Sequence, residues 1–385
     1  MLPSLSLVKL ILVSLAAHAA LAGARITTSL YALSMQATEF TVGTLIALFS
    51  LFPMLFAVTS GRIIDRIGIV TPIVAGAIAM AIGCMASGII GGLPVLYLAT
   101  LLIGTGFMVI QVAAQHTVGA MSSNENRSAN FSWLALGFSI SGFCGPVIAG
   151  FMIDHASFTS SYIVFGLFAT VALGLGLFGR LRLIHVALPK TENDRHAGSM
   201  LDLLRTPEMR RIYLVGTLLS SAWDLFTFML PIHGTRAGFS ASTIGLILGC
   251  FSVATFVVRL AMPWIARHRS EWQVLTAALA LAAVCYVLFP FTRQPLSLAI
   301  VAAILGLAVG ASQPNMLALL HRFAPTGREA EAVGVRVMIG NACQVALPLA
   351  FGGAGTAIGV SAVFWGMGAL ISAGLPLAWR KARQD

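Results

Sequence analysis

The chain has 385 residues, of which 58% are hydrophobic and 9% charged, and its formal net charge is +10. A soluble domain carries about 25% charged residues, so this composition excludes an ordinary water-soluble protein. Apolar runs that could cross a hydrocarbon layer of roughly 30 Å as helices recur along the whole length. These runs are continuous rather than alternating, which excludes a membrane β-barrel. We therefore predict an all-α, multi-pass membrane protein.

Twelve membrane spans are predicted in chain order. They lie near residues 8–34, 40–60, 69–91, 94–118, 128–152, 160–180, 210–233, 241–264, 271–290, 295–319, 329–351 and 357–379. The stretch after Lys9 imitates a signal peptide, but it stays apolar past Arg25 and its removal would leave an odd number of helices. We expect it to be retained.

Basic residues are distributed unevenly between the loops. If the N-terminus is cytoplasmic, one side receives most of the Lys and Arg residues, and the other receives only Arg236 and Arg293. By the positive-inside rule, this bias places both termini in the cytoplasm. The positive charge then reflects topology in a bacterial inner membrane, and we expect a lipid bilayer rather than nucleic acid as partner.

The two halves of the chain resemble each other. The polar segment 181–209 separates residues 1–180 from residues 210–385, and each half has six spans. At an offset of 202 residues, without a gap, the identities are Gly43/Gly245, Phe49/Phe251, Ser50/Ser252, Gly104/Gly306, Gln111/Gln313, Pro146/Pro348 and Gly150/Gly352. This pattern predicts two six-helix bundles repeated about an axis normal to the membrane. Residues 199–211 are expected to form a short surface helix before the seventh span.

A charged stretch, SGRIIDRIGIV, follows the second span. It has the pattern Gly-x-x-x-Asp-Arg-x-Gly, whose fixed places are Gly61, Asp65, Arg66 and Gly68. Arg62 is a further charged residue inside the pattern. In this position it resembles the signature loop of the major facilitator superfamily, although Ile69 stands where the family usually has a basic residue. The resemblance extends over the whole chain through helix count, repeat and central linker. It implies a secondary transporter that works as a monomer on a small-molecule substrate.

Two further family motifs match in part. The fourth span has Gly104 and Gly106, but Thr100 stands where the family often has an Arg linked to proton coupling. The fifth span resembles the Gly-Pro motif of drug:proton antiporters, with departures at Ser141 and Ala149; the matching residues are Gly145, Pro146 and Gly150. This resemblance implies efflux driven by a proton or other ion gradient, without a bound cofactor.

The charged stretch also has a physical interpretation as a gating loop. Gly61 would let the chain leave the second helix, and Gly68 would let it turn into the third. The resemblance implies that the eleventh helix begins near this stretch, around residues 327–329. Asp65 would dock at that helix N-terminus, because it carries partial positive charge. The contact would stabilise a closed cytoplasmic side by about 1–2 kcal/mol.

Charged side chains inside the spans are the first candidate substrate or ion ligands. Arg25, Asp224 and Arg336 each cost about 2.5–3.5 kcal/mol in lipid, so each should face a cavity or a partner. At the repeat offset Arg25 falls on Thr227, within one turn of Asp224. The family resemblance implies that the first and seventh helices meet across a cavity, where the two could pair. The pair could act as a gate, as a proton site centred on Asp224, or as a structural brace. Arg336 could bind an anion or extend to the membrane surface.

Amide side chains inside the spans are the second set of candidates, and one pair of them coincides at the repeat offset. They are Gln111, Gln115, Gln313, Asn315, Asn341 and Gln344. Such groups either bind ligand or hydrogen-bond between helices. The five cysteines lie inside predicted spans without metal-ligand spacing, and no catalytic constellation or nucleotide-binding loop occurs. We therefore expect neither an enzyme nor a metal site.

The leading functional hypothesis is a proton- or gradient-coupled exporter of a small amphiphilic or anionic molecule. Two membrane arginines against one carboxylate, Arg25 and Arg336 against Asp224, favour anionic cargo. An organic-anion importer or exchanger fits the same residues. A receptor or sensor that does not transport is the alternative from another class.

Overall fold

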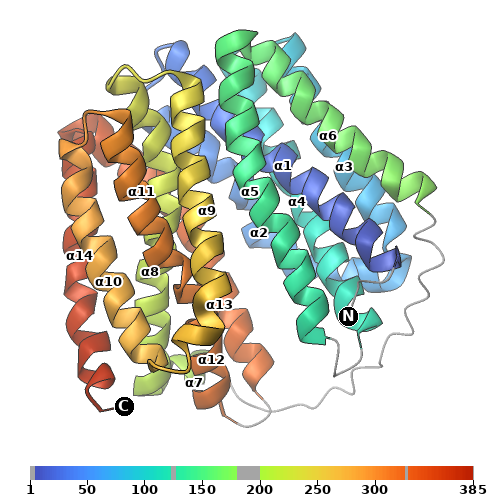
Figure 1. The fold of residues 1–385 in the computed structure, drawn as a ribbon. Helices are drawn as coiled ribbons and strands as arrows, with labels where there is room; N and C mark the ends of the chain where they lie inside the picture. The colour runs from blue at the N-terminus through green and yellow to red at the C-terminus, as the bar shows by residue number, and fades with distance from the viewer. Residues whose placement is uncertain (1–4, 123–126, 180–199, 326–327, 385) are drawn as a thin grey trace. The chain divides into compact units, whose positions relative to one another are not determined.

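The computed structural model describes residues 5–122, 127–179, 200–325 and 328–384, and at a few positions, including 57–63, 65 and 66, the backbone alone. These residues form helices and no β-strand (Figure 1). Twelve spans among them are long and apolar enough to cross a membrane, when α11 and α12 are counted as one. The prediction of an all-α protein with twelve membrane helices is confirmed.

Within each described range, the helices follow one another with short connections. Their bounds are α1 Leu5–Ser34, α2 Glu39–Ile67, α3 Val70–Ile89, α4 Leu93–Met121, α5 Arg127–His155, α6 Phe158–Phe178, α7 Met200–Arg205, α8 Pro207–Arg236, α9 Ala241–Ile265, α10 Glu271–Leu288, the 3₁₀ turn η2 Phe289–Phe291, α11 Pro295–Gly310, α12 Ser312–Phe323, α13 Glu329–Ile358 and α14 Val360–Ala382. The short α7 confirms the expected helix before the seventh span.

The chain divides into two compact units. Unit 1 comprises Met1–Ala37, Thr44–Glu192 and Ser240–Gly245, and unit 2 comprises Thr38–Gly43, Asn193–Phe239 and Leu246–Asp385. Each unit therefore includes a short helix-initiating segment from the other half of the sequence. In unit 1, α1 packs on α4, α5 and α6, and α3 packs on α4 and α6. In unit 2, α8 packs on α12, α13 and α14, and α10 packs on α11, α12 and α14. With α8 in the place of α1 and α10 in the place of α3, the two units have the same packing scheme.

Residues identical between the repeats mark close approaches of two backbones. A methyl group added at Gly104 would collide with the Phe49 carbonyl in unit 1, and one added at Gly306 would collide with the Phe251 carbonyl in unit 2. Small residues let membrane helices approach closely, and van der Waals packing then holds them together. The repeat predicted from the sequence thus corresponds to equivalent helix packing in the two units.

The second helix is longer than predicted. α2 continues through Gly61 to Ile67, so the prediction that Gly61 lets the chain leave the helix is wrong. A glycine inside a helix costs only about 1 kcal/mol, and the neighbouring isoleucines continue the apolar pattern. Ile64 is buried, 2% exposed. Gly68 ends the helix instead, with φ +76° and its amide 2.9 Å from the Ile64 carbonyl.

The predicted span 295–319 is interrupted. α11 ends at Gly310 and α12 begins at Ser312. Pro314 explains the break, because it has no amide hydrogen for the Gly310 carbonyl and its ring would clash there.

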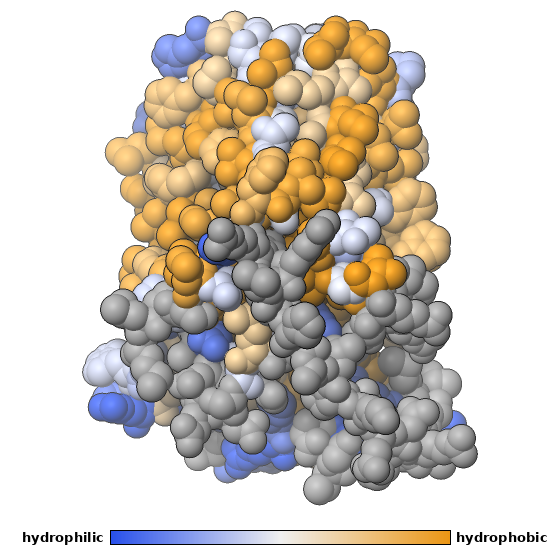
Figure 2. Space-filling model, turned by 90° about the vertical axis from the view of Figure 1, so that its right-hand side faces the viewer, coloured by the Kyte–Doolittle hydropathy of each residue, from blue (hydrophilic) through white to orange (hydrophobic). Residues whose placement is uncertain are grey.

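Hydrophobic side chains cover the outside of unit 1. Figure 2 shows them (orange) across the upper part of one face. Exposed members on α3 and α6 are Ile78, Ile82, Ile89, Leu167, Val171, Leu177 and Phe178. Such a continuous apolar surface is suited to lipid rather than water.

Candidate functional site

The interior of unit 1 contains a polar contact between α1 and α5. His18 Nδ1 lies 2.7 Å from the Ser141 hydroxyl. The imidazole also packs against Phe107 and Phe138, with ring centroids 5.4 and 5.1 Å apart. Ser141 stands where the antiporter motif prefers glycine, so this departure supplies the partner of the histidine. The cluster combines an ionisable ring with two aromatic faces.

Two residues predicted as ligands lie near this cluster. Arg25 is two turns after His18 on α1, half-buried, and it interacts electrostatically with His18. Gln111 is half-buried and one turn after Phe107 on α4, whereas Gln115 is exposed. Residues two turns apart on a helix share a face. Arg25 and His18 therefore share a face of α1, and Gln111 lies one turn from Phe107, which packs on the His18 ring.

Unit 2 holds a cation beside an aromatic ring and an amide. Arg259 Nη2 on α9 donates to Gln313 Oε1 on α12 at 3.3 Å. Its guanidinium carbon lies 5.9 Å from the centre of the Trp223 ring on α8, within the range of a cation–π contact. Trp223 in turn packs edge-on against Phe251, with ring centroids 4.7 Å apart. The sequence predicted Gln313 as a ligand but not Arg259.

The remaining predicted ligands of unit 2 lie on α8, α12 and α13. Asp224 is half-buried, next to Trp223, and interacts electrostatically with Tyr286 and Cys343. Half-buried side chains on α13 are Arg336, Asn341 and Gln344. Asn315 is buried, and its Nδ2 donates to the carbonyl of Ala311 on its own helix at 2.7 Å. Because Arg25 belongs to unit 1 and Asp224 to unit 2, their pairing stays a prediction.

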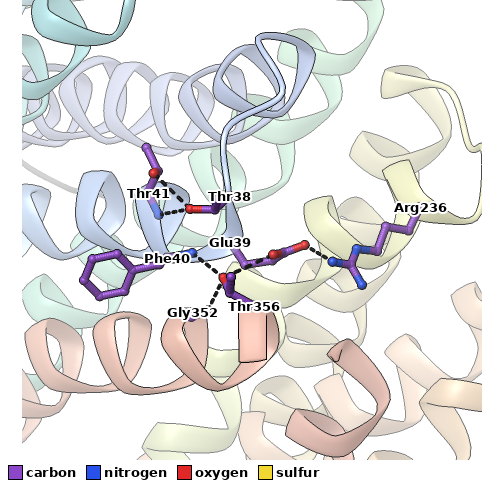
Figure 3. Close-up of polar contacts among 7 residues, drawn as sticks. All are labelled: Thr38, Glu39, Phe40, Thr41, Arg236, Gly352 and Thr356. Carbon is purple, nitrogen blue, oxygen red and sulfur yellow. Dashed lines mark hydrogen bonds and ion pairs between the residues drawn. The ribbon is translucent and has the colours of Figure 1, made fainter. Parts of the chain in front are cut away.

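A polar network at the start of α2 was not predicted from the sequence. Figure 3 shows the Glu39 carboxylate between Arg236 and Thr356. Glu39 Oε1 pairs with the Arg236 guanidinium, and Glu39 Oε2 lies 3.2 Å from the Thr356 hydroxyl. The amide of Phe40 donates to the same hydroxyl at 3.2 Å. The last turn of α8 and the last turn of α13 therefore hold the first turn of α2 within unit 2.

A corresponding contact occurs in unit 1 at the start of α9. The Asp154 carboxylate, near the end of α5, accepts the amides of Ala241 at 3.0 Å and Ser242 at 2.7 Å. The Ser240 hydroxyl accepts the amide of Thr243 at 3.2 Å. The first three amides of α9, which have no partner within the helix, are thus all bonded. An anion at a helix N-terminus is also favoured by the helix dipole.

The two end contacts are related by the 202-residue repeat. Asp154 corresponds to Thr356, and Ser242 corresponds to Phe40, so each side chain caps the equivalent amide. Added methyl groups at Gly43 and Gly245 would collide with the carbonyls of Pro348 and Pro146, respectively. The Gly-Pro motif of the fifth helix is therefore part of a packing contact, with the Pro146 carbonyl lying against Gly245.

Glycines of the fifth helix motif make two different contacts. Gly145 faces α1, where an added methyl would lie 2.8 Å from the Ala22 side chain. At Gly150, an added methyl would collide with the carbonyl of Ala241. Both positions require a residue without a side chain.

The predicted gating residues can be described only in part. Gly68 begins the turn between α2 and α3, but the side chains of Arg62, Asp65 and Arg66 lie outside the described residues, as does residue 327 of the predicted docking site. The Asp65 latch therefore stays a prediction. Within the described ranges, no group of three or more His, Cys, Asp or Glu residues could hold a metal ion.

A family comparison identifies this architecture. The model of the Major Facilitator Superfamily matches residues 10–348. The chain belongs to the Major Facilitator Superfamily. It is a multi-pass integral membrane protein of a transporter family, consistent with a bacterial inner membrane. The family resemblance predicted from the charged stretch is confirmed.

Individual relatives are distant. The tetracycline resistance protein, class B, of Escherichia coli is 26% identical over 233 residues, which are 58% of this chain and 57% of that protein. The uncharacterized MFS-type transporter YfkF of Bacillus subtilis (strain 168) is 23% identical over 228 residues, 56% of this chain and 54% of that protein. The matched region spans just over half the length of both relatives. A crystal structure of the peptide transporter POT in complex with sulfate has a TM-score of 0.81 at 16% identity, covering 98% of this chain and 95% of that one.

Proposed function

We propose that this superfamily member exports a small amphiphilic or anionic molecule by alternating access, driven by a proton gradient. It would act as a monomer, without a bound cofactor or nucleic-acid partner, and with both termini in the cytoplasm. The Arg259–Gln313–Trp223 arrangement in unit 2 is the observation that carries this proposal.

The substrate class follows from the chemistry of that arrangement. A guanidinium binds carboxylates and other anions through several donors, while an indole ring offers a flat apolar face. A ligand that is anionic at one end and planar or apolar at the other would contact both. Arg25 and Arg336 add further cations inside the spans, where they are costly unless they face a cavity or partner.

The direction of transport and its coupling to protons are argued from a relative, a motif and one acidic residue. The similarity to a tetracycline resistance protein and the Gly145-Pro146 motif favour efflux against a proton gradient. Asp224 is the proposed proton site, since it is a half-buried acid in the middle of a span. A carboxyl in such a place can be neutral in dry surroundings and ionised beside water or a cation.

Alternating access would make and break the end contacts of α2 and α9. In the described state, Asp154 holds the start of α9, while Thr356 and Arg236 hold the start of α2. These bonds lie at helix ends and involve a few polar groups each. Their rupture would cost a few kcal/mol, which a bound ligand or proton can offset.

The test is transport in inverted membrane vesicles with a compound panel weighted toward anionic amphiphiles. We expect uptake into vesicles when a pH gradient is imposed, and loss of substrate-driven proton movement in Asp224→Asn. A matched control is Glu271→Gln, which removes an acid from the first turn of α10. Proton coupling that persists in Asp224→Asn at the original stoichiometry would remove Asp224 from the mechanism.

An organic-anion importer or exchanger is the second candidate, because the same cations would serve it. Vesicles of the opposite orientation distinguish the two. Uptake that occurs in right-side-out vesicles, and is absent from inverted ones, would favour import over export.

A further inference from the structure

A cavity of about 500 Å³ opens at one end of unit 2, where α8 and α13 end and α14 begins. Three basic side chains line it: His233, Arg236 and Arg293. The Arg236 side chain is 50% exposed, and Arg293 is exposed as well. His233 Nε2 lies 3.3 Å from the Thr292 carbonyl, which holds the ring against the cavity wall. The cavity is large enough for a small ligand or a headgroup.

The positive charge of this cavity comes from residues that depart from the distribution of basic residues between the loops. Arg236 and Arg293 are the two basic residues that depart from the loop bias seen in the sequence. They come from segments far apart in the sequence, and the fold brings both to one cavity. Glu39 pairs with Arg236 and offsets one of the two positive charges. A net positive charge remains for a ligand.

The start of α14 adds donors to the same cavity. Gly359, with φ +90°, is the residue before the helix and has no side chain to cap it. Val360 and Ser361, the first two residues of α14, line the cavity. Unbonded amides at a helix N-terminus and the helix dipole favour phosphate and carboxylate groups. Arginines and a helix N-terminus therefore converge on one volume.

Apolar side chains surround the cavity on its lipid side. Ile358 lines it and is 69% exposed, and Phe291, beside the lining residue Pro290, is 67% exposed. Phe291 packs against Trp365, with ring centroids 6.1 Å apart. Exposed aromatic residues of this kind are typical of the level where membrane meets water. An anionic group bound here would have acyl chains or other apolar groups as natural neighbours.

We propose that this cavity binds a phosphate-bearing anion, either the headgroup of an anionic phospholipid or a free phosphate ester, independently of the transported molecule. Arg293 and Arg236 contact its oxygens, and the amides at the start of α14 donate to the same anion. The exposed Ile358 and Phe291 make the lipid headgroup the favoured source. The site is distinct from the Arg259–Gln313–Trp223 arrangement.

The lipid arm of the test measures binding to the purified full chain by native mass spectrometry in phosphatidylcholine nanodiscs that contain added phosphatidylglycerol. We expect phosphatidylglycerol to be retained, and Arg293→Gln to weaken its binding about five-fold, since a basic residue near anionic lipid contributes about 1 kcal/mol. Glu39→Gln should strengthen binding, because it removes the carboxylate that offsets Arg236. Arg267→Gln, at an exposed position beyond the end of α9, is the matched control for lost charge and should change nothing.

The soluble arm titrates inorganic phosphate and glycerol 3-phosphate against protein in phosphatidylcholine nanodiscs and follows the thermal midpoint. A rise that Arg293→Gln abolishes, without phosphatidylglycerol retention, assigns the site to a soluble phosphate ester. The proposal is overturned if neither probe binds, or if Arg293→Gln and Arg267→Gln weaken binding equally. Arg293→Gln leaves the Glu39–Arg236 pair intact, and circular dichroism of that variant verifies its folding.

Discussion

Asp154→Ala should release the start of α9 from the end of α5. The substitution removes two hydrogen bonds, of 3.0 and 2.7 Å, from the amides of Ala241 and Ser242. Loss of a helix cap costs about 0.5–2 kcal/mol, and the helix dipole adds about 0.3–1 kcal/mol. Asp154 is exposed, so screening keeps the total near the middle of this range, about 2 kcal/mol. Such a loss raises the population of the released state about 30-fold.

The assay is the alkylation rate of the thiol introduced by Ala241→Cys, in a background without the five native cysteines. Ala241 is buried, 9% exposed, so its labelling reports release of the contact. We expect Asp154→Ala to increase the rate about 30-fold, and Asp154→Asn, which keeps one acceptor oxygen, to increase it about five-fold. Equal rates in Asp154→Ala and the unmodified background would refute the assignment of this contact as one that opens.

Three further substitutions test the packing and the proposed ligand groups. Gly104→Val should lower the thermal midpoint, because overpacking against the Phe49 carbonyl costs about 1–3 kcal/mol. The control Gly174→Val should leave the midpoint unchanged, because no atom lies within 4 Å of the added carbon. Arg259→Lys should retain part of the transport of anionic substrates and Arg259→Gln should lose it, as measured by vesicle uptake; equal uptake by both would contradict an anion-binding role. Ser141→Ala removes the hydroxyl that contacts His18 and the carbonyls of Gly137 and Phe138. It should lower the thermal midpoint by about 1 kcal/mol of lost hydrogen bonding, and an unchanged midpoint would show that these bonds contribute nothing.

Much of the helix packing was predictable from the repeat, because close approaches restrict residue type strongly. A glycine pressed against a carbonyl cannot be replaced by a larger residue, so Gly104 and Gly306 retain their identity in both halves. Gln111 and Gln313 also coincide, but Gln111 is half-buried while Gln313 is exposed and bonds to Arg259. An amide side chain can hydrogen-bond either to water or to another side chain. Its repetition therefore predicts equivalent positions on the helices, but not the hydrogen-bond partner of each.

The end contacts were not predictable from local pattern. Glu39 and Arg236 are 197 residues apart, and the sequence indicated only that each lies at the edge of a span. Arg236 was recognised as an exception to the charge bias, which was the available signal that it has a specific role. Likewise Arg259, six residues before the last residue of α9, was not predicted as a ligand, since sequence alone does not place Trp223 beside it.

The close approaches at Gly43 and Gly245 lie at equivalent positions of the internal repeat, one in each unit. In a symmetric dimer of identical chains, every change at such a contact would appear twice. A single chain with an internal repeat is free of that constraint, and here the equivalent capping residues are Asp154 at one contact and Thr356 at the other. The close helix packing is the same at both contacts, but the charge of the capping residue is not. The two contacts can therefore respond differently to a proton, a salt or a ligand.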